Sequence, residues 1–141
     1  MGGIYSVKPV FVDSSGFYAF LDSTDPFHAQ ARELFLAARD EKWQLFTSNY
    51  VVHESWALIQ ARLGWAAVED WMDALLAMCE IVWVDEILHR LGMARVRQAR
   101  ERRLSLTDCV SFEVMSARGC SDVIADDEHF RKLGYRSPAR R

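Results

Sequence analysis

The sequence predicts an α/β fold with three layers, in which a short parallel sheet is flanked by helices. Short apolar runs of strand length alternate with longer segments whose apolar residues recur with helical spacing. Half of the 141 residues are hydrophobic and 26% are charged, which is typical of a globular domain with a buried core. Two of the apolar runs end directly at an acidic residue, and parallel sheets bind ligands beyond the carboxyl ends of their strands.

The first half of the chain predicts two strands and four helices. Residues 9–12 and 44–47 are short apolar runs, which we expect to form buried strands. The predicted helices are residues 14–21, broken at Asp22-Ser23-Thr24; residues 26–40, with Pro26 at the first position and an apolar stripe of Ala29, Ala31, Leu34, Phe35 and Ala38; residues 49–63, capped by Ser48 or Asn49 and ended by Gly64; and residues 65–78, with Val68, Trp71, Leu75 and Met78 on one side.

The second half of the chain continues the same alternation. Residues 81–84 and 123–125 are apolar and predict a third and a fourth strand. The predicted helices are residues 86–102, a helix capped by Thr107 that ends at Arg118-Gly119, and residues 128–133; Tyr135 and Arg136 can add an edge strand before Pro138.

Four acidic residues are candidates for an active site. Asp13 follows the first strand, Asp127 lies just past the strand 123–125, Asp108 lies in the first turn of a helix, and Glu54 lies within the helix 49–63. If the fold brings them together, they form a carboxylate cluster whose charge a bound metal ion can neutralise. Hard oxygen ligands of this type favour Mg²⁺ or Mn²⁺, and no pairing of histidine with serine or cysteine competes as a catalytic site.

Each acid also has a structural explanation. Asp13 and Asp127 precede helices, where aspartate is favoured as an N-cap, and the helix dipole favours Asp108 in a first turn. Glu54 is harder to explain in this way, because a buried carboxylate without a partner is costly. Its helix face is largely apolar and carries Tyr50, Val51, Ala57, Leu58 and Ala61.

Composition argues against several other classes of protein. Cys79, Cys109 and Cys120 show no CxxC spacing and the histidines form no ligand motif, which argues against a disulfide framework or a zinc site. No apolar run approaches the roughly 20 residues that a membrane span needs, so we expect no membrane and a cytoplasmic protein. The net charge is −3, but basic residues concentrate late in the chain and can form a local surface for a phosphodiester: Arg95, Arg97, Arg100, Arg102, Arg103, Arg131, Lys132, Arg136, Arg140 and Arg141.

Four segments carry the candidate acids and their polar neighbours: residues 10–15 (VFVDSS), residues 47–54 (TSNYVVHE), residues 104–109 (LSLTDC) and residues 127–130 (DEHF). In order and spacing they resemble the four motifs of the PIN-domain family, and within it the VapC-type toxins of bacterial toxin–antitoxin pairs. The resemblance extends over nearly the whole chain. The chain is therefore expected to be a single PIN domain over residues 1–141, with loose ends at residues 1–8 and 138–141.

The resemblance implies a compact α/β/α fold and Mg²⁺- or Mn²⁺-dependent cleavage of RNA. It assigns Asp13 and Asp108 as the principal metal ligands, with Glu54 and Asp127 completing the catalytic site. Supporting or substrate-binding polar groups are Ser14, Ser15, Asn49 and Thr107. The resemblance further implies a small antitoxin as partner and a homodimer.

Three alternatives stay open from the sequence. The fourth acid can be Asp126 or Asp127, and Asp127 is chosen because it lies three positions before Phe130, as in the family. The protein can instead be a non-catalytic α/β RNA-binding module or a phospho-acceptor signalling module, although Ser14 stands where a receiver usually carries a second acid. Aromatic and methionine side chains of the central helices can line a groove for an antitoxin or pack in the core: Trp56, Trp65, Trp71, Met72 and Met78.

Overall fold

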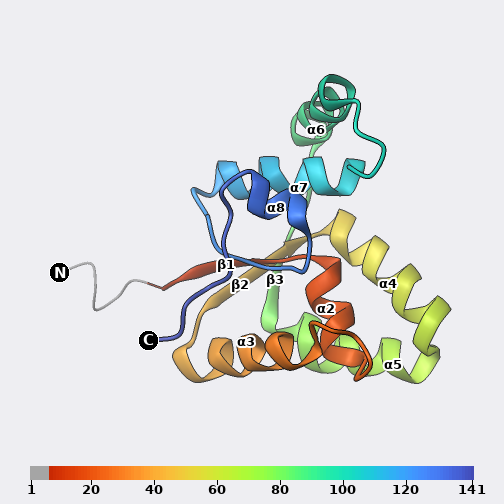
Figure 1. Ribbon diagram of the computed structural model, residues 1–141, viewed down its shortest axis with the longest axis vertical. Coiled ribbons are helices and arrows are strands. Elements are labelled where there is room, and N and C mark those ends of the chain that lie inside the picture. Colours follow the sequence, from red (N-terminus) through yellow and green to blue (C-terminus); the bar gives the residue numbers. More distant parts are fainter. Residues whose placement is uncertain (1–6) are drawn as a thin grey trace.

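A four-stranded, fully parallel sheet forms the middle layer of the protein, and helices cover both of its faces (Figure 1). The computed structural model describes residues 7–141, so residues 1–6 of the predicted leader lie outside the described residues. The strands are β1 (Pro9–Val12), β2 (Gln44–Ser48), β3 (Cys79–Val82) and β4 (Val123–Ile124). The α/β/α class and the parallel sheet predicted from the sequence are confirmed.

The strand order β3-β2-β1-β4 creates a switch point between β1 and β4. From β1 the chain continues outward to β2 and β3 on one side, and β4 is added later on the other side. Phe11 pairs with Phe46 of β2 and with Val123 of β4, so β1 is central. Ligands of open parallel sheets bind beyond the strand ends at such a switch point. Asp13 and the pair Asp126 and Asp127 follow the two strands that meet there.

The helices fall into two groups on either side of the sheet. In Figure 1, α2 (Ser14–Leu21), α3 (His28–Glu41) and α5 (Trp65–Asp70) cover one face, while α7 (Leu106–Ala117) and α8 (Glu128–Lys132) cover the other. α6 (Glu86–Ala99) packs outside α7, and α4 (Asn49–Leu63) lies on the side where the strands end. Within residues 7–141 no helix is long and apolar enough to cross a membrane.

Aromatic side chains fill the core between the sheet and its helices. The Phe17 ring packs edge-on against Trp71 at 5.7 Å between centroids, and Phe11 packs edge-on against Phe46 at 5.4 Å. All four side chains are fully buried, and burial of each side chain of this size contributes about 1.5–3 kcal/mol. Trp71 is therefore a core residue, which removes it from the predicted antitoxin groove.

A glycine sets how closely α2 approaches β4. A Cβ atom on Gly16 would lie 2.4 Å from the carbonyl oxygen of Ile124, too close for any side chain. The Asp13 N–H donates to the same carbonyl at 3.1 Å. The start of α2 and the end of β4 are thereby held together, which brings the segments that carry Asp13 and Asp127 to one place.

Several predicted boundaries were wrong in ways that local chemistry explains. α3 begins at His28, not at residue 26, because the Asp25 side chain accepts the Phe27 N–H at 2.8 Å and forms a turn; Ala29 is exposed, unlike the rest of its stripe. The predicted helix 65–78 continues past α5 as a π-helical turn, Trp71–Leu75, and a 3-10 turn, Leu76–Met78.

Three later elements also differ from the prediction. β3 begins and ends two residues earlier than expected, and α6 ends at Ala99, where Arg100 takes a left-handed conformation with φ 49°. Ser105, not Thr107, caps α7. The predicted edge strand is only a single bridge, between Asp122 and Arg136.

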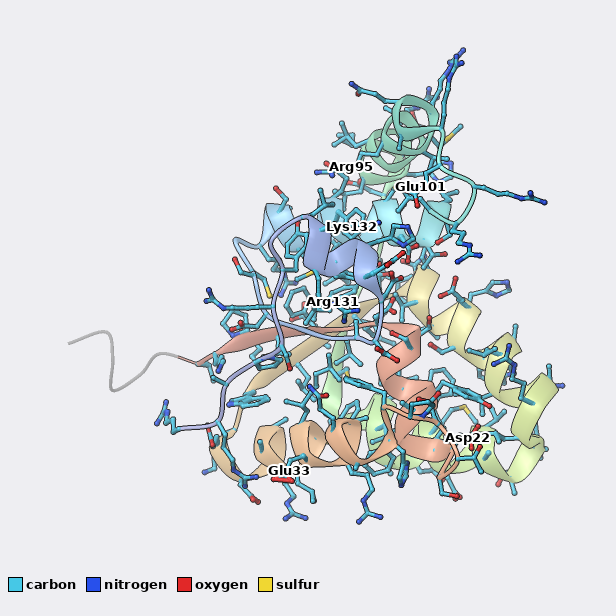
Figure 2. All side chains as sticks on the ribbon, viewed as in Figure 1. Asp22, Glu33, Arg95, Glu101, Arg131 and Lys132 are labelled. Atoms are coloured by element: carbon cyan, nitrogen blue, oxygen red, sulfur yellow. The ribbon has the colours of Figure 1, made fainter. Side chains whose placement is uncertain are left out.

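The C-terminal residues contact α3. Arg140 forms ion pairs with Asp40 at 2.9 Å, Glu33 at 3.4 Å and Glu41 at 3.6 Å. Glu33 is labelled on the outer side of α3 in Figure 2. Such exposed pairs contribute little individually, but together they fix the course of the tail beside this helix.

Candidate active site

The four predicted acids line one pocket at the carboxyl edge of the sheet. Its volume is about 360 Å³, and its walls come from four separate parts of the chain. Asp13 stands between β1 and α2, Glu54 in α4, Asp108 in the first turn of α7, and Asp127 between β4 and α8. Segments more than 100 residues apart therefore contribute carboxylates to the same cavity.

Asp13 is buried and uses only one of its two carboxylate oxygens. Oδ2 accepts hydrogen bonds from the Ser15 hydroxyl at 2.6 Å and from the Ser15 N–H at 3.2 Å, so Asp13 is the N-cap of α2. Oδ1 is buried and has no hydrogen-bond partner among residues 7–141. Burial, together with the nearby charges of Asp108 and Glu54, raises the pKa of Asp13 to about 7. The N-cap explanation accounts for one oxygen and leaves the other unexplained.

Glu54 is half-buried and is oriented by Ser14, one of the predicted supporting polar residues. The Ser14 hydroxyl donates to Glu54 Oε1, which ties α4 to the start of α2. Val51 on the same helix is buried, but Ala57 and Ala61 are exposed, so the face of Glu54 is less apolar than the sequence predicted. The carboxylate thus faces the pocket and not the interior of the core.

Asp108 is held in place by a capping box. The Ser105 hydroxyl accepts the Asp108 N–H at 3.0 Å, and Asp108 Oδ2 accepts the Ser105 N–H at 3.2 Å. Burial and the neighbouring charge of Asp127 raise the pKa of Asp108 to about 6. One helix start therefore fixes both the position and the direction of this carboxylate.

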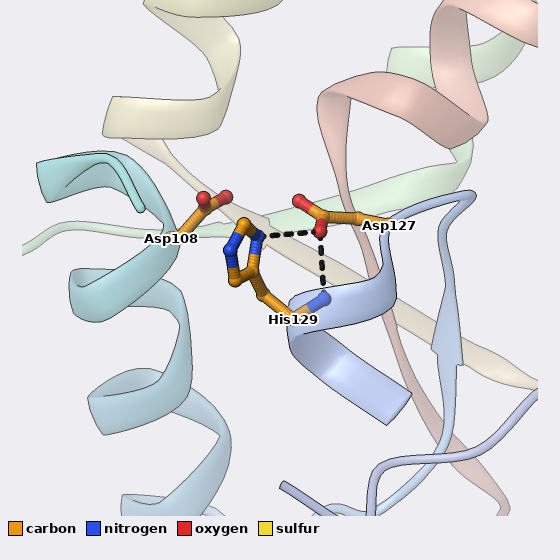
Figure 3. A group of neighbouring side chains, drawn as sticks. All are labelled: Asp108, Asp127 and His129. Carbon is orange, nitrogen blue, oxygen red and sulfur yellow. Dashed lines mark hydrogen bonds and ion pairs between the residues drawn. The ribbon is translucent and has the colours of Figure 1, made fainter. Parts of the chain in front are cut away.

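Asp127 is held by a histidine that the sequence interpretation did not assign to the site. Oδ1 of Asp127 accepts from the His129 N–H and contacts His129 Nδ1, both at 2.9 Å (Figure 3). The buried imidazole reaches on the other side to Glu101 Oε1 at 2.9 Å, and this contact is the main cause that raises the pKa of His129. Glu101 comes from the α6–α7 connection, so no local pattern could reveal its link to residue 129.

Asp126 lies beside Asp127 but differs from it in its surroundings. Its side chain is exposed and lines the rim of the pocket, while its N–H donates to the Ser15 hydroxyl at 2.9 Å. Ser15 therefore joins the Asp13 carboxylate to the backbone after β4. Asp127, in contrast, is half-buried and caps α8.

Asn49 and Thr107 share a pocket with Glu54 but do not line the acid pocket. Asn49 Oδ1 accepts the Val84 N–H at 2.8 Å and fixes the connection between β3 and α6. Thr107 is half-buried and lines a second pocket together with Asn49 and Glu54. These two residues border the acid pocket without entering it.

Two arginines stand at the rim of the acid pocket, Arg62 from α4 and Arg103 from the α6–α7 connection. Of the predicted late basic residues, Arg103 lies beside the acids, whereas Arg62 was not in the predicted set. Other members of the late basic set are paired: Arg95 with Glu113, Lys132 with Glu128, and Arg136 with Asp122. Figure 2 shows Arg95, Arg131 and Lys132 on the α7–α8 side of the molecule, the side that also carries Glu101.

The donor set fits a divalent cation. One ligand atom each of Asp108, Asp127 and His129 lies within 4.8 Å of the others, and the Asp108 carboxylate faces Asp127 in Figure 3. Asp13 Oδ1 is a buried acceptor without a donor, which is costly unless a cation or a donor meets it. A carboxylate-rich set of this kind suits a hard cation.

The aromatic side chains that the sequence proposed for a partner groove lie on α4 (Trp56), α5 (Trp65) and the following π-helical turn (Trp71). Trp56 contacts both Trp71 and Trp65, with ring centroids 6.1 Å and 6.0 Å apart. Trp65 is 53% exposed and Met78 36% exposed, while Met72 is half-buried. Trp65 and Met78 are therefore exposed apolar side chains, while Trp71 belongs to the core beneath Trp56.

Comparison with known proteins agrees with this geometry. No protein-family model matches the chain. The 23S rRNA-specific endonuclease VapC20 of Mycobacterium tuberculosis is 29% identical over 129 residues, which cover 89% of this chain and 95% of VapC20. The crystal structure of VapC20, described as a sarcin–ricin loop cleaving toxin, matches with a TM-score of 0.79, 28% identity and the same coverage.

A more distant structure shares the fold alone. VapBC2 from Rickettsia felis, bound to a DNA fragment from its promoter, matches with a TM-score of 0.64 at 11% identity and covers 92% of this chain and 96% of that one. The likeness extends over nearly the whole length of each protein. The resemblance to the VapC-type branch of the PIN-domain family, predicted from four short segments, is therefore confirmed.

Proposed function

We propose that this protein is a metal-dependent endoribonuclease and the toxin of a type II toxin–antitoxin pair. The observation that carries the proposal is the convergence of Asp13, Glu54, Asp108 and Asp127 on one pocket that contains a buried, unpaired carboxylate oxygen. The likeness to VapC20 supports the same activity, because that protein is named for cleavage of 23S rRNA. A structured loop of the large ribosomal RNA is accordingly the first substrate to test.

The acids have distinct roles in this proposal. Asp13 and Asp108 are the principal ligands of Mg²⁺ or Mn²⁺, and Glu54 and Asp127 complete the site directly or through water. A divalent ion held there supplies Lewis-acid stabilisation of the charge that develops on the phosphate oxygens. The unpaired oxygen of Asp13 supports its role, because an ion would satisfy an acceptor that the protein leaves without a donor.

The remaining groups position these acids and the substrate. Ser15 orients Asp13, Ser14 orients Glu54, and Ser105 orients Asp108. Arg62 and Arg103 at the rim contact backbone phosphates of the RNA. Water attacks phosphorus and the bond to the 3′ oxygen breaks. The water proton passes to the carboxylate cluster or solvent, and the departing oxygen takes a proton, which leaves a 5′-phosphate and a 3′-hydroxyl.

The proposed partners are a small antitoxin and a second copy of the chain, in the cytoplasm. The exposed apolar surface around Trp65 and Met78 supports docking of a partner helix on α4 and α5. Co-expression with a short candidate antitoxin should suppress RNA cleavage, and removing it should restore cleavage. Cleavage that is indifferent to every such partner argues against the toxin assignment but not against the nuclease.

A cleavage assay tests the central activity. Purified protein should cut RNA with Mg²⁺ or Mn²⁺ and stop when EDTA is added, and Asp13→Asn and Asp108→Asn should abolish cutting. Asp73→Asn is the matched control, because its exposed carboxylate lines neither pocket and makes no hydrogen bond or ion pair within residues 7–141. RNA binding without cleavage at any metal concentration indicates a non-catalytic module, and labelling of Asp13 by acetyl phosphate indicates a phospho-acceptor.

A further inference from the structure

A second pocket shares Glu54 with the acid pocket. Its volume is about 540 Å³, and it is lined by Asn49, Tyr50, His53, Glu54 and Thr107. Because Glu54 lines both pockets, the two lie next to each other. The walls come from the N-terminal ends of α4 and α7, which lie next to each other in Figure 1.

The second pocket presents polar groups that the protein itself does not use. His53 is exposed, and within residues 7–141 neither its ring nor the Thr107 hydroxyl makes a hydrogen bond. Asn49 uses its carbonyl oxygen to bind the Val84 N–H, which leaves its amide N–H groups available. Hydrogen-bond donors and acceptors therefore line the same opening.

The ring of Tyr50, which lines the second pocket, is held by a residue that does not line it. The Tyr50 hydroxyl is hydrogen-bonded to His89 Nδ1 of α6, and the two rings lie 5.8 Å apart. Tyr50 is half-buried, so its orientation is set by α6 while part of its surface remains accessible. A held aromatic ring beside free hydrogen-bonding groups is the arrangement with which proteins bind unstacked RNA bases.

The two pockets that share Glu54 differ in the charged residues that line them, and this difference indicates which part of an RNA each pocket suits. Arg62 and Arg103 line the acid pocket, whereas among the described residues 7–141 no lysine or arginine lines the second pocket, and Glu54 is the only acid there. Phosphates suit the first pocket, and an uncharged base suits the second.

We propose that the second pocket binds the nucleobase of a nucleotide next to the scissile phosphate. Tyr50 stacks on the base, and His53, Thr107 and the amide of Asn49 meet its edge. The inference rests on the proposed nuclease activity for its biological meaning, but binding of a base there is measurable without cleavage.

Photo-crosslinking tests the base site directly. A single-stranded RNA carrying 4-thiouridine is irradiated with the full-length protein in Ca²⁺, and the tryptic peptide of residues 43–62 is fragmented. We expect the crosslink at Tyr50 or His53, and its loss in Tyr50→Ala and in His53→Ala. The matched control is Trp83→Ala, which removes an aromatic side chain that is 73% exposed and lines neither pocket. Crosslinks that appear only elsewhere, or that survive both substitutions, overturn the proposal.

Cleavage kinetics separate this inference from the proposed function. Tyr50→Ala should raise KM by about five- to 150-fold, the usual effect of removing one stacked base contact, and should shift the preferred nucleotide at the cut. Tyr50→Phe keeps the ring and should stay within a few fold of wild type. If Tyr50→Ala and His53→Ala both cleave RNA with the KM and site preference of the wild type, the base site is refuted but the nuclease activity is not. A specific crosslink without any cleavage refutes the nuclease and retains the base site.

Discussion

Replacing Asp13 by asparagine should stabilise the metal-free protein at alkaline pH while removing its metal site. Asparagine is as good an N-cap as aspartate, so the start of α2 is preserved. A pKa of about 7, against an ordinary value of 3.8, means that ionising Asp13 costs about 4 kcal/mol more in the folded chain than in the unfolded chain. The wild-type protein therefore has its full stability below the pKa that Asp13 has in the unfolded chain. It loses about 4 kcal/mol as the pH rises from there through the pKa of Asp13 in the folded chain.

The stability gain should therefore depend on pH. At pH 8 in EDTA, Asp13→Asn should raise the free energy of unfolding by about 2–4 kcal/mol, because an uncharged amide replaces a buried charge. At about pH 3, below the pKa of Asp13 in the unfolded chain, this carboxyl is protonated in both states, and the two proteins should be nearly equal.

Urea denaturation at the two pH values, with unchanged m-values, measures this difference. Mg²⁺ should then stabilise the wild type and leave Asp13→Asn unchanged, since an ion that binds only the folded state adds stability. Asp73→Asn, at an exposed carboxylate outside both pockets, is the control and should behave as the wild type throughout. An Asp13→Asn protein that is less stable than wild type at pH 8 in EDTA, or equally changed at both pH values, refutes the reasoning.

Four further substitutions test how the site is held. Ser14→Ala removes the hydrogen bond to Glu54 and should lower kcat about tenfold, because a bond to a charged group contributes about 1.5–3 kcal/mol and its loss frees the Glu54 carboxylate from its position; unchanged kcat would show that Glu54 needs no such orientation. Gly16→Ala should destabilise by about 1–3 kcal/mol, since its Cβ would meet the Ile124 carbonyl at 2.4 Å, and thermal unfolding with an unchanged Tm would contradict this close approach. His129→Ala and Glu101→Gln should each weaken metal affinity about 10–100-fold, as loss of a group that orients a metal ligand commonly does. Calorimetric titration with Mn²⁺ measures this affinity. A wild-type affinity in both variants would mean that the Asp127–His129–Glu101 contacts are only structural.

Local sequence patterns predicted the parts of the site that depend on neighbouring residues. The run before Asp13 gave β1 and the cap of α2, and Gly64 correctly ended α4. The error at Thr107 was avoidable, because Ser105 stands three residues before Asp108, which is the spacing of a capping box. Asp108 is fixed by that box and not by a threonine cap.

Tertiary contacts account for what the sequence could not predict. Glu101 and His129 meet across 28 positions, and His89 meets Tyr50 across 39. Neither pair has a spacing that local periodicity can detect. The same holds for the rim arginine Arg103, whose neighbours in the sequence suggest only a solvated basic turn. Its place beside the acids follows from the packing of α6 on α7, where Gly92 allows close contact with Val110.

The claim on which the account depends is that carboxylates from four distant segments bind one divalent ion. A crystal structure of the full chain grown with Mn²⁺ tests it most directly, because the anomalous signal locates the metal independently of the protein atoms. We expect a peak at the carboxyl edge of the sheet, about 2.0–2.3 Å from Asp13 Oδ1 and from an Asp108 oxygen. A pocket without such a peak at saturating Mn²⁺, with Asp13 and Asp108 turned to separate surfaces, would contradict it.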